Sequence, residues 1–445
     1  MQQFAVLAPK GVNLNSLIRF ATSIDSTLKL DVNYLKYLIN YILSGMARRF
    51  EISDHDIYIP IYSQAVRIRF SRHIKHIRFL CETWLGNINI LFRKDYQVGQ
   101  SFSYAISPFY QNEPVEVHYI ENTRIANLAR QDQTLISPVL TAKNCSFHYL
   151  LKYFSNKHLK INLPLAVKLC SERFQTHQNY QKHLSEMSTI LEIFNGTYRI
   201  YYSKESDGRV HTSLTRLPKV YRQFICYDNK KLLEIDLSNA VIYFLAALSK
   251  GLISDNIISS SLVYMFAEMP EPLDIAEIDL LWDLACKGRF YDFFIPEFLK
   301  VFNEMDLRKA YILHNSDDYV GSPQQIRKVV KKRIFSMLFA KPSQFVAEQK
   351  IFAKYFPSLL DKIQNYKTIY PYNQFSHMLF QIEANVVLGK VAKKFNSIYW
   401  RKAPIFSLHD CLITTCDYGI ILFEVMNNEF TEIFGMPPQL ELNGW

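Results

Sequence analysis

The chain has 445 residues, of which 49% are hydrophobic, so it can build more than one hydrophobic core and does not have the composition of a disordered protein. Lysine and arginine exceed aspartate and glutamate by ten, which favours a polyanionic partner, nucleic acid before an acidic membrane surface. The seven cysteines contain no CxxC pair, which argues against a zinc site and a disulfide framework. The sequence also shows no signal peptide and no apolar run of membrane-spanning length. Together these features predict a cytoplasmic protein without a membrane partner.

The N-terminal residues 1–45 are expected to be helical. Apolar residues recur there at helical spacing, most regularly at Leu35, Leu38, Ile39 and Ile42.

The next segments carry weaker signals. Residues 50–60 alternate around a proline, as an edge strand does. Residues 67–80 interleave arginine and lysine with aromatic and aliphatic residues, a pattern that fits equally a surface tracking a nucleic-acid backbone and an amphipathic element with a solvated basic side. Residues 85–145 suggest no chemistry, and helix is expected again over 146–195.

A polar, cationic stretch precedes the middle of the chain, after a turn expected at Asp207-Gly208. Its candidate ligand-binding residues are Arg209, His211, Thr212, Arg216, Lys219 and Arg222. Their density suits a phosphate-rich ligand, although a charged hairpin on the surface would have the same composition.

An aspartate then follows a short apolar run. The run ending at Ile235 predicts a buried strand with Asp236 at its tip, and Ser238 and Asn239 begin a buried helix that stops at Gly251. A carboxylate between a strand and a helix N-terminus can hold a metal ion, although such an aspartate is more often only a helix cap.

Residues 251–320 read as a helical insertion, and a further helix is expected to start at Ser322-Pro323. Four of its residues recur every fourth position along one side: Arg327, Lys331, Phe335 and Phe339. The two cations can neutralise a triphosphate and the two rings can stack on a base or sugar. A helix with a solvated cationic end and an aromatic end in the core would show the same pattern.

The C-terminal region predicts a helix over 375–395 that carries Gln381, followed by a strand hairpin over 405–415. The tight turn of the hairpin is His409-Asp410, which raises a second aspartate to the tip of an apolar hairpin.

Two aspartates on neighbouring strand tips are the minimum that can clamp two divalent cations about 3.5–4 Å apart for in-line phosphoryl transfer. One ion would activate a 3′-hydroxyl and the other would stabilise the leaving pyrophosphate. Magnesium, or manganese, suits such a site because it prefers oxygen ligands and keeps several waters.

The segments around Asp236, Arg327–Phe339 and Asp410, in this order, resemble motifs A, B and C of the family A (polymerase I-like) DNA polymerases and of the related single-subunit phage-type RNA polymerases. The stretch beginning at Asp207 resembles the segment with which family A enzymes approach primer–template. The resemblance covers about residues 180–445.

The resemblance implies an α+β, right-hand polymerase. Residues 181–445 would form an antiparallel β palm with helical fingers at about 251–345, and residues 1–180 a helix-rich thumb or nucleic-acid-binding region. The implied reaction is template-directed nucleotidyl transfer: a 3′-hydroxyl attacks the nucleotide α-phosphate with two Mg²⁺ or Mn²⁺ ions. The implied partners are a DNA or RNA primer–template and nucleoside triphosphates.

The resemblance also assigns residues. The metal ligands would be Asp236, the carbonyl of Leu237 and Asp410. The nucleotide site would contain Arg327, Lys331, Phe335, Phe339, Val241 and His409, with Lys331 or His409 donating a proton to the pyrophosphate. Contacts to nucleic acid would come from Arg209, His211, Thr212, Arg222 and Gln381.

Several positions depart from the family pattern. Val241 stands where the DNA polymerases have a glutamate beside the ribose 2′ position, and Cys411 where they have a second acid after motif C. Phe339 replaces a tyrosine. The missing glutamate favours ribonucleotides and the missing tyrosine hydroxyl disfavours them, so the choice of sugar stays open.

Residues 1–180 contain no D-x-E pair of a proofreading exonuclease, which fits a small polymerase that replicates a plasmid, phage or other mobile element. Other hypotheses are an RNA polymerase or primase, an untemplated or protein-primed transferase, and a degenerate palm that only binds nucleic acid. The sequence does not determine the oligomeric state.

Overall fold

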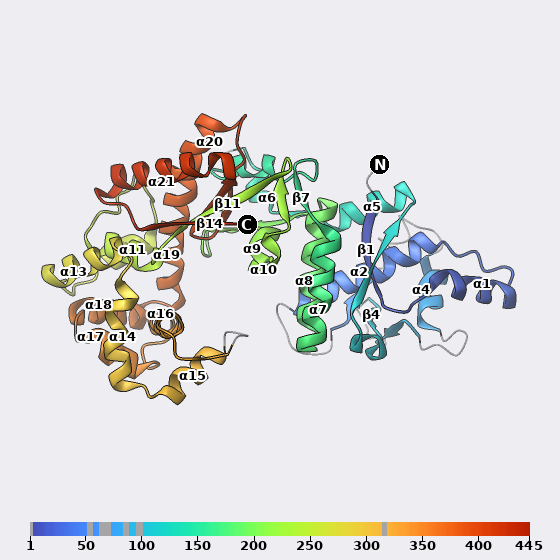
Figure 1. Ribbon diagram of the computed structural model, residues 1–445, viewed down its shortest axis with the longest axis horizontal. Coiled ribbons are helices and arrows are strands. Elements are labelled where there is room, and N and C mark those ends of the chain that lie inside the picture. Colours follow the sequence, from blue (N-terminus) through green and yellow to red (C-terminus); the bar gives the residue numbers. More distant parts are fainter. Residues whose placement is uncertain are drawn as a thin grey trace. The chain divides into compact units, whose positions relative to one another are not determined.

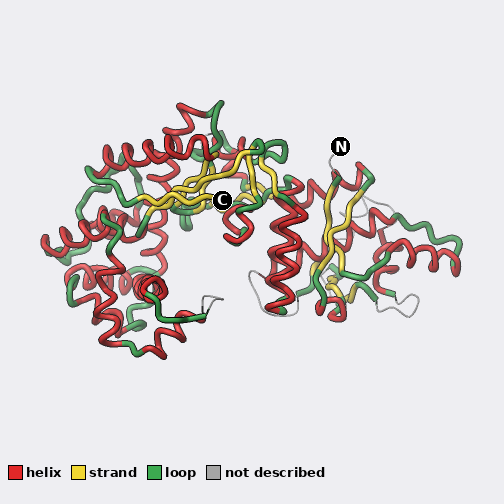
Figure 2. Tube along the Cα trace, viewed as in Figure 1, coloured by secondary structure: helices red, strands yellow, loops and turns green. Residues whose placement is uncertain are grey.

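The computed structural model describes residues 3–50, 57–61, 73–82, 89–94, 101–143, 145–313 and 318–445 (Figure 1). The chain forms two compact units, each assembled from separate segments: unit 1 from 1–136, 154–200 and 212–229, and unit 2 from 137–153, 201–211 and 230–445. Both units combine helices with mostly antiparallel strands (Figure 2), so the mixed α+β class is confirmed. The finer division into palm, fingers and thumb stays a prediction, as does the domain boundary at residue 180.

Unit 1 begins with a strand, so the prediction of helix throughout residues 1–45 is wrong at its start. Strand β1 (Phe4–Pro9) pairs antiparallel with β5 (Val115–Ile120), and all six residues of β1 are buried. A short apolar run that is buried on every side has no periodicity to separate a strand from a helix.

The helices of unit 1 pack on this strand pair. After α1 (Leu14–Ile24), helix α2 (Val32–Phe50) contacts β1 and α8 (Tyr180–Asn195), which in turn packs against α7 (Leu163–His177). The other α-helices and strands described in this unit are β2 (Ile59–Pro60), α4 (His73–Cys81), β3 (Leu91–Arg93), β4 (Ser103–Ile106), α5 (Thr123–Gln133), β6 (Leu135–Ile136), β7 (Leu159–Ile161), α9 (Ser213–Arg216), α10 (Lys219–Arg222) and β10 (Ile225–Tyr227).

The basic stretch 67–80 is described only from residue 73, because residues 67–72 lie outside the described residues. Within α4, Lys75 and Arg78 are exposed while Ile77 and Phe79 are buried. This part is therefore an amphipathic helix with a basic outer side, and a role in nucleic-acid binding stays a prediction.

The sheet of unit 2 is centred on β11 (Lys230–Leu237). Strand β13 (Cys411–Thr415) pairs with it on one side and β14 (Leu440–Gly444) on the other, and β12 (Phe406–Leu408) pairs with β13, all antiparallel. The strand and the hairpin predicted here are confirmed, and β11 extends one residue beyond Asp236.

Helix α11 (Ala240–Ser249) follows the central strand and is buried from Ala240 to Leu248; it packs against α13 (Ile275–Cys286) and α19 (Asn373–Val386). Helix α19 continues through a π-helical segment (Val387–Ala392) into α20 (Lys393–Tyr399). The remaining elements are α6 (Pro138–Thr141), β8 (Arg199–Tyr202, which continues from unit 1 into unit 2), β9 (Val210–His211), α12 (Ser261–Ala267), α14 (Phe290–Val301), α15 (Glu304–Ile312), α16 (Pro323–Phe339), α17 (Val346–Ala353), α18 (Pro357–Ile369) and α21 (Gly419–Phe434). Within the described ranges, no helix has both the length and the apolarity needed to cross a membrane.

Candidate metal and nucleotide site

The register of β11 and β13 brings the two predicted metal ligands together. Ile235 lies opposite Leu412, so Asp236 follows the paired segment at the end where the β12–β13 turn carries Asp410. Cys411 stands between them, its Sγ 2.6 Å from Asp236 Oδ1 and 3.8 Å from Asp410 Oδ1. One ligand atom from each of the three residues lies within 4.8 Å of the others, close enough to share one ion.

Burial destabilises the ionised form of both carboxylates. It raises the pKa of Asp236, and together with the nearby charge of Asp236 it raises the pKa of Asp410 to about 6. Lys331 and Arg209 act in the opposite direction on Asp410 but do not offset these effects. Two carboxylates that repel each other in a partly dry site are stabilised by a divalent ion, so the donor set fits magnesium or manganese.

The helix after Asp236 begins where predicted, but it lacks a side-chain cap. Asn239 occupies the N-cap position with a left-handed φ of 60°, and its side chain makes no capping hydrogen bond. Ser238 instead donates from Oγ to Oε1 of Glu441 at 2.5 Å, and Glu441 lies directly opposite Asp236 in β14. Glu441 is therefore a third acid beside the two aspartates, and no motif or spacing in the sequence singles it out.

Helix α16 carries the predicted cation and ring series on one side. The ring centroids of Phe335 and Phe339 are stacked 5.9 Å apart, and the Lys331 ammonium lies 5.6 Å from the Phe335 ring. Ser322 caps the helix as predicted, in a reciprocal capping box with Gln325. Lys331 perturbs the pKa of both Asp236 and Asp410, so this cation lies close to the two carboxylates.

Tyr291 of α14 belongs to this site and was missed, because the sequence around it reads as core aromatic. Its ring centroid is 5.7 Å from the Arg327 guanidinium, 5.9 Å from the Lys331 ammonium and 5.8 Å from the Phe335 ring. Burial and the charge of Asp410 both raise its pKa, and its buried hydroxyl has no hydrogen-bond partner among the described residues.

Arg327 already has partners within the protein, at the surface of a cleft. Its Nε lies 3.1 Å from Asp292 and its NH2 donates to the carbonyl of Gly288 at 3.3 Å. These groups line an open cleft of about 510 Å³ that also contains Lys287, Arg289 and Glu441. A triphosphate that binds Arg327 would therefore have to displace Asp292 from it.

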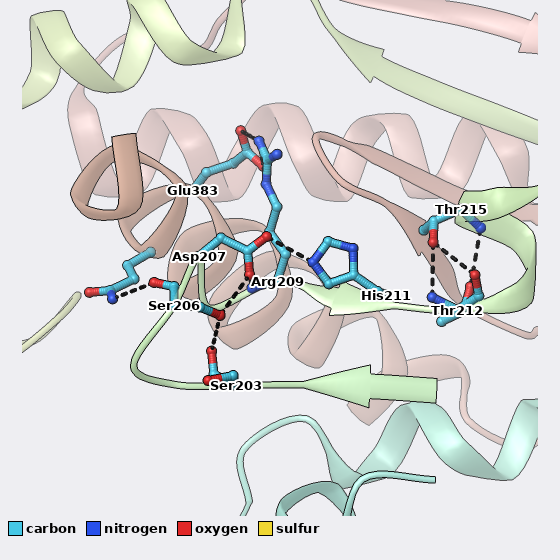
Figure 3. Close-up of polar contacts among 9 residues, drawn as sticks. Ser203, Ser206, Asp207, Arg209, His211, Thr212, Thr215 and Glu383 are labelled. Carbon is cyan, nitrogen blue, oxygen red and sulfur yellow. Dashed lines mark hydrogen bonds and ion pairs between the residues drawn. The ribbon is translucent and has the colours of Figure 1, made fainter. Parts of the chain in front are cut away.

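Two of the predicted nucleic-acid contacts are held by carboxylates (Figure 3). Arg209 forms two hydrogen bonds with Glu383 of α19, at 2.8 and 2.7 Å, and its guanidinium stacks 3.9 Å from the Phe380 ring centroid. Asp207 accepts from His211 Nε2 at 2.7 Å. Burial raises the pKa of Glu383 to about 7 despite its arginine partner.

His211 also approaches the turn that carries Asp410. Its ring centroid lies 5.5 Å from that of His409, which precedes Asp410 and has a left-handed φ of 59°. The pair Asp207–His211 thus lies beside the β12–β13 turn, and contact of His211 with nucleic acid stays a prediction.

The remaining predicted contacts are placed differently. Gln381 donates to the carbonyls of Lys204 and Ser206 at 3.2 and 2.8 Å and lines an open cleft of about 1060 Å³ in unit 2. Thr212 caps α9 in a box with Thr215 (Figure 3). Thr212 and Arg222 belong to unit 1, whereas Arg209, His211 and Gln381 belong to unit 2.

The last two predicted residues, Val241 and Leu237, are buried at the start of α11 and at the end of β11. Val241 is the second residue of the helix that follows Asp236, and Leu237 is the residue directly after that aspartate.

No family model matches this chain, and none of the curated proteins matches it in sequence. Among solved structures, one that is similar is the POL domain of Pol1 from M. smegmatis, in complex with DNA primer-template and dNTP. The identity is 10% and the TM-score 0.37, and the match covers 63% of this chain. The chain spans 55% of the length of that structure.

Proposed function

We propose that this protein is a nucleotidyltransferase that extends a nucleic-acid primer on a template, as a family A-like polymerase does. The observation that supports this proposal is the meeting of three sequence segments in unit 2: Asp236 from β11, Asp410 from the β12–β13 turn, and Lys331 from α16. Two acids and a cation near one point are what the transfer of a nucleotidyl group requires.

Asp236 and Asp410 would hold the divalent ions, with the Leu237 carbonyl as a further ligand. The ions, when bound, supply charge stabilisation to the attacking and leaving oxygens. Arg327 and Lys331 would bind the triphosphate, and Lys331 or His409 would donate a proton to the departing pyrophosphate.

The rings of Phe335 and Phe339 would form the floor on which the incoming base or sugar packs, with Val241 near the ribose. Tyr291 would hold the cationic side of α16 in place, because its ring lies against both Arg327 and Lys331. Nucleic-acid contacts at Arg209, His211, Thr212, Arg222 and Gln381 are proposed from the sequence resemblance.

Primer extension on a primed DNA template with Mg²⁺ tests this proposal, with all four dNTPs or all four NTPs supplied. Asp236→Asn and Asp410→Asn are each expected to lower extension by at least about 10²-fold, because each removes one of the two negative charges that would hold the divalent ions. Binding to the primed template should stay close to that of the unaltered protein. Asp417→Asn is the matched control, because Asp417 follows β13 at its other end and pairs with exposed Lys230.

The same assay, run separately with dNTPs and with NTPs, shows which sugar the protein accepts. Extension with dNTPs but not with NTPs indicates a DNA polymerase. Extension with NTPs but not with dNTPs indicates an RNA polymerase or primase. Extension without template would indicate an untemplated transferase. Full activity in either asparagine variant would contradict the proposal.

A degenerate palm is the second candidate function. The observation that favours it is Cys411, which stands where a further acid is expected and hydrogen-bonds to Asp236. In that case the protein would bind the primed template tightly and extend it with neither nucleotide set.

A further inference from the structure

The thiol of Cys411 lies at the centre of the carboxylate pair. Cys411 is the first residue of β13 and is 8% exposed. Its Sγ is 2.6 Å from Asp236 Oδ1 and 3.8 Å from Asp410 Oδ1. The three side chains come from paired strands and the turn that joins two of them, so the backbone holds them near one another.

This spacing is close to what one ion needs. Oxygen and sulfur ligands about 2.0–2.3 Å from a tetrahedral ion lie roughly 3.3–3.8 Å from one another. The distance from Sγ to Asp410 already falls in this range, and the distance from Sγ to Asp236 would lengthen by about 1 Å as the hydrogen bond is replaced by two bonds to the ion.

The chemistry of the three donors differs. Magnesium binds through oxygen and makes no use of a thiol, whereas zinc and cadmium accept sulfur readily and also bind carboxylates. A site with two carboxylates and one thiol therefore favours a thiophilic ion over magnesium, although the carboxylates alone can hold magnesium.

We propose that Cys411 is a third metal ligand, and that Zn²⁺ and related thiophilic divalent ions compete with Mg²⁺ at the Asp236–Asp410 centre. The proposal rests on the proposed function, whose metal site it shares, and adds the class of ion that regulates it. When Mg²⁺ is bound, the thiol keeps its proton and its hydrogen bond to Asp236. When a thiophilic ion binds, the S–H bond breaks, the proton passes to solvent, and a bond between thiolate and metal forms without any change in oxidation state.

Titration of the full chain with Cd²⁺ tests this proposal through the ultraviolet charge-transfer band that a thiolate gives when it binds cadmium. The band is expected in the unaltered protein and in Cys416→Ser, whose cysteine is exposed beyond the other end of the same strand. In Cys411→Ser the band at one equivalent should disappear, and Cd²⁺ affinity should fall at least about tenfold, the lower end of the loss seen even when an outer partner of a metal ligand is removed. Mg²⁺ affinity should fall much less than Cd²⁺ affinity.

Thiol alkylation of the unaltered protein, mapped by mass spectrometry, gives a second readout that needs no variant to fold. Cd²⁺ or Zn²⁺ should protect Cys411 from alkylation, and Mg²⁺ should not. An unchanged band in Cys411→Ser, or equal alkylation of Cys411 with and without Cd²⁺, would overturn the proposal.

The two proposals fail separately. Mg²⁺-dependent extension without a Cd²⁺ band would overturn the role of Cys411 and leave the polymerase. A Cd²⁺ band at Cys411 in a protein that does not extend primers would overturn the polymerase and leave the metal site.

Discussion

At the scale of single residues, burial perturbs the ionisation of Asp410 in the candidate metal centre. Its pKa is raised from 3.8 to about 6, first by burial and then by the charge of Asp236. The folded protein therefore holds this proton more tightly than the unfolded chain, so the contribution of this carboxyl to stability is present at low pH and is lost as the pH rises through about 6.

Metal affinity should instead rise with pH, because a divalent ion binds the ionised carboxylates. We expect Mg²⁺ affinity to be constant well above pH 6 and to fall below it, by up to about tenfold per pH unit for one displaced proton. Calorimetric titration with Mg²⁺ between about pH 5 and pH 8 measures this dependence. Asp417→Asn should preserve the profile, and an affinity that does not change across this range would show that Asp410 does not bind the ion.

At the scale of elements, the Arg209–Glu383 pair ties the β8–β9 hairpin to helix α19 (Figure 3). The Glu383 side chain is 1% exposed and that of Arg209 is 14% exposed. Removing one partner of such a pair leaves a buried charge without compensation, which costs more than the pair contributes when intact. The hairpin also carries His211, whose ring lies near His409 in the turn of the metal centre.

Arg209→Met should therefore destabilise unit 2 by about 3–5 kcal/mol at pH 8. The cost should be smaller near pH 5, because Glu383, with a pKa of about 7, is then protonated and needs no cation. Denaturant unfolding at the two pH values measures the difference. The double variant Arg209→Met, Glu383→Gln should recover part of the loss, and an equal cost at both pH values would show that the pair acts through packing and not through charge.

At the scale of the whole molecule, every residue of the candidate metal and nucleotide site belongs to unit 2. Unit 1 has its own buried core, formed by β1, α2 and α8 among other elements. A ligand that binds one folded unit stabilises that unit by RT ln(1 + [L]/Kd), which is about 2.7 kcal/mol at a hundred times Kd.

When Mg²⁺ and a nucleoside triphosphate are added without nucleic acid, hydrogen exchange should consequently slow in unit 2 and not in unit 1. Amides of β11, α16 and β13 should exchange more slowly, while those of α7 and α8 in unit 1 should not change. The Asp236→Asn variant is the control, since it should lose the protection. Equal slowing in α7 and α8 would mean that ligand binding is coupled to both units.

The sequence by itself determined the elements whose patterns are local. The hairpin around His409-Asp410, the strand before Asp236, and the capped helix with Arg327, Lys331, Phe335 and Phe339 on one side all follow from short-range apolar spacing and turn residues. The buried strand β1 was mistaken for helix, because a fully buried run has no alternation to reveal it.

Only the tertiary structure decided which side chains meet. Glu383 engages Arg209, although more than 170 residues separate the two, and Tyr291 joins the cations of α16. Glu441 reaches Asp236 only through the pairing of β14 with β11. Such contacts depend on strand register and helix packing, which bring together residues distant in sequence and leave no periodic signal in the chain itself.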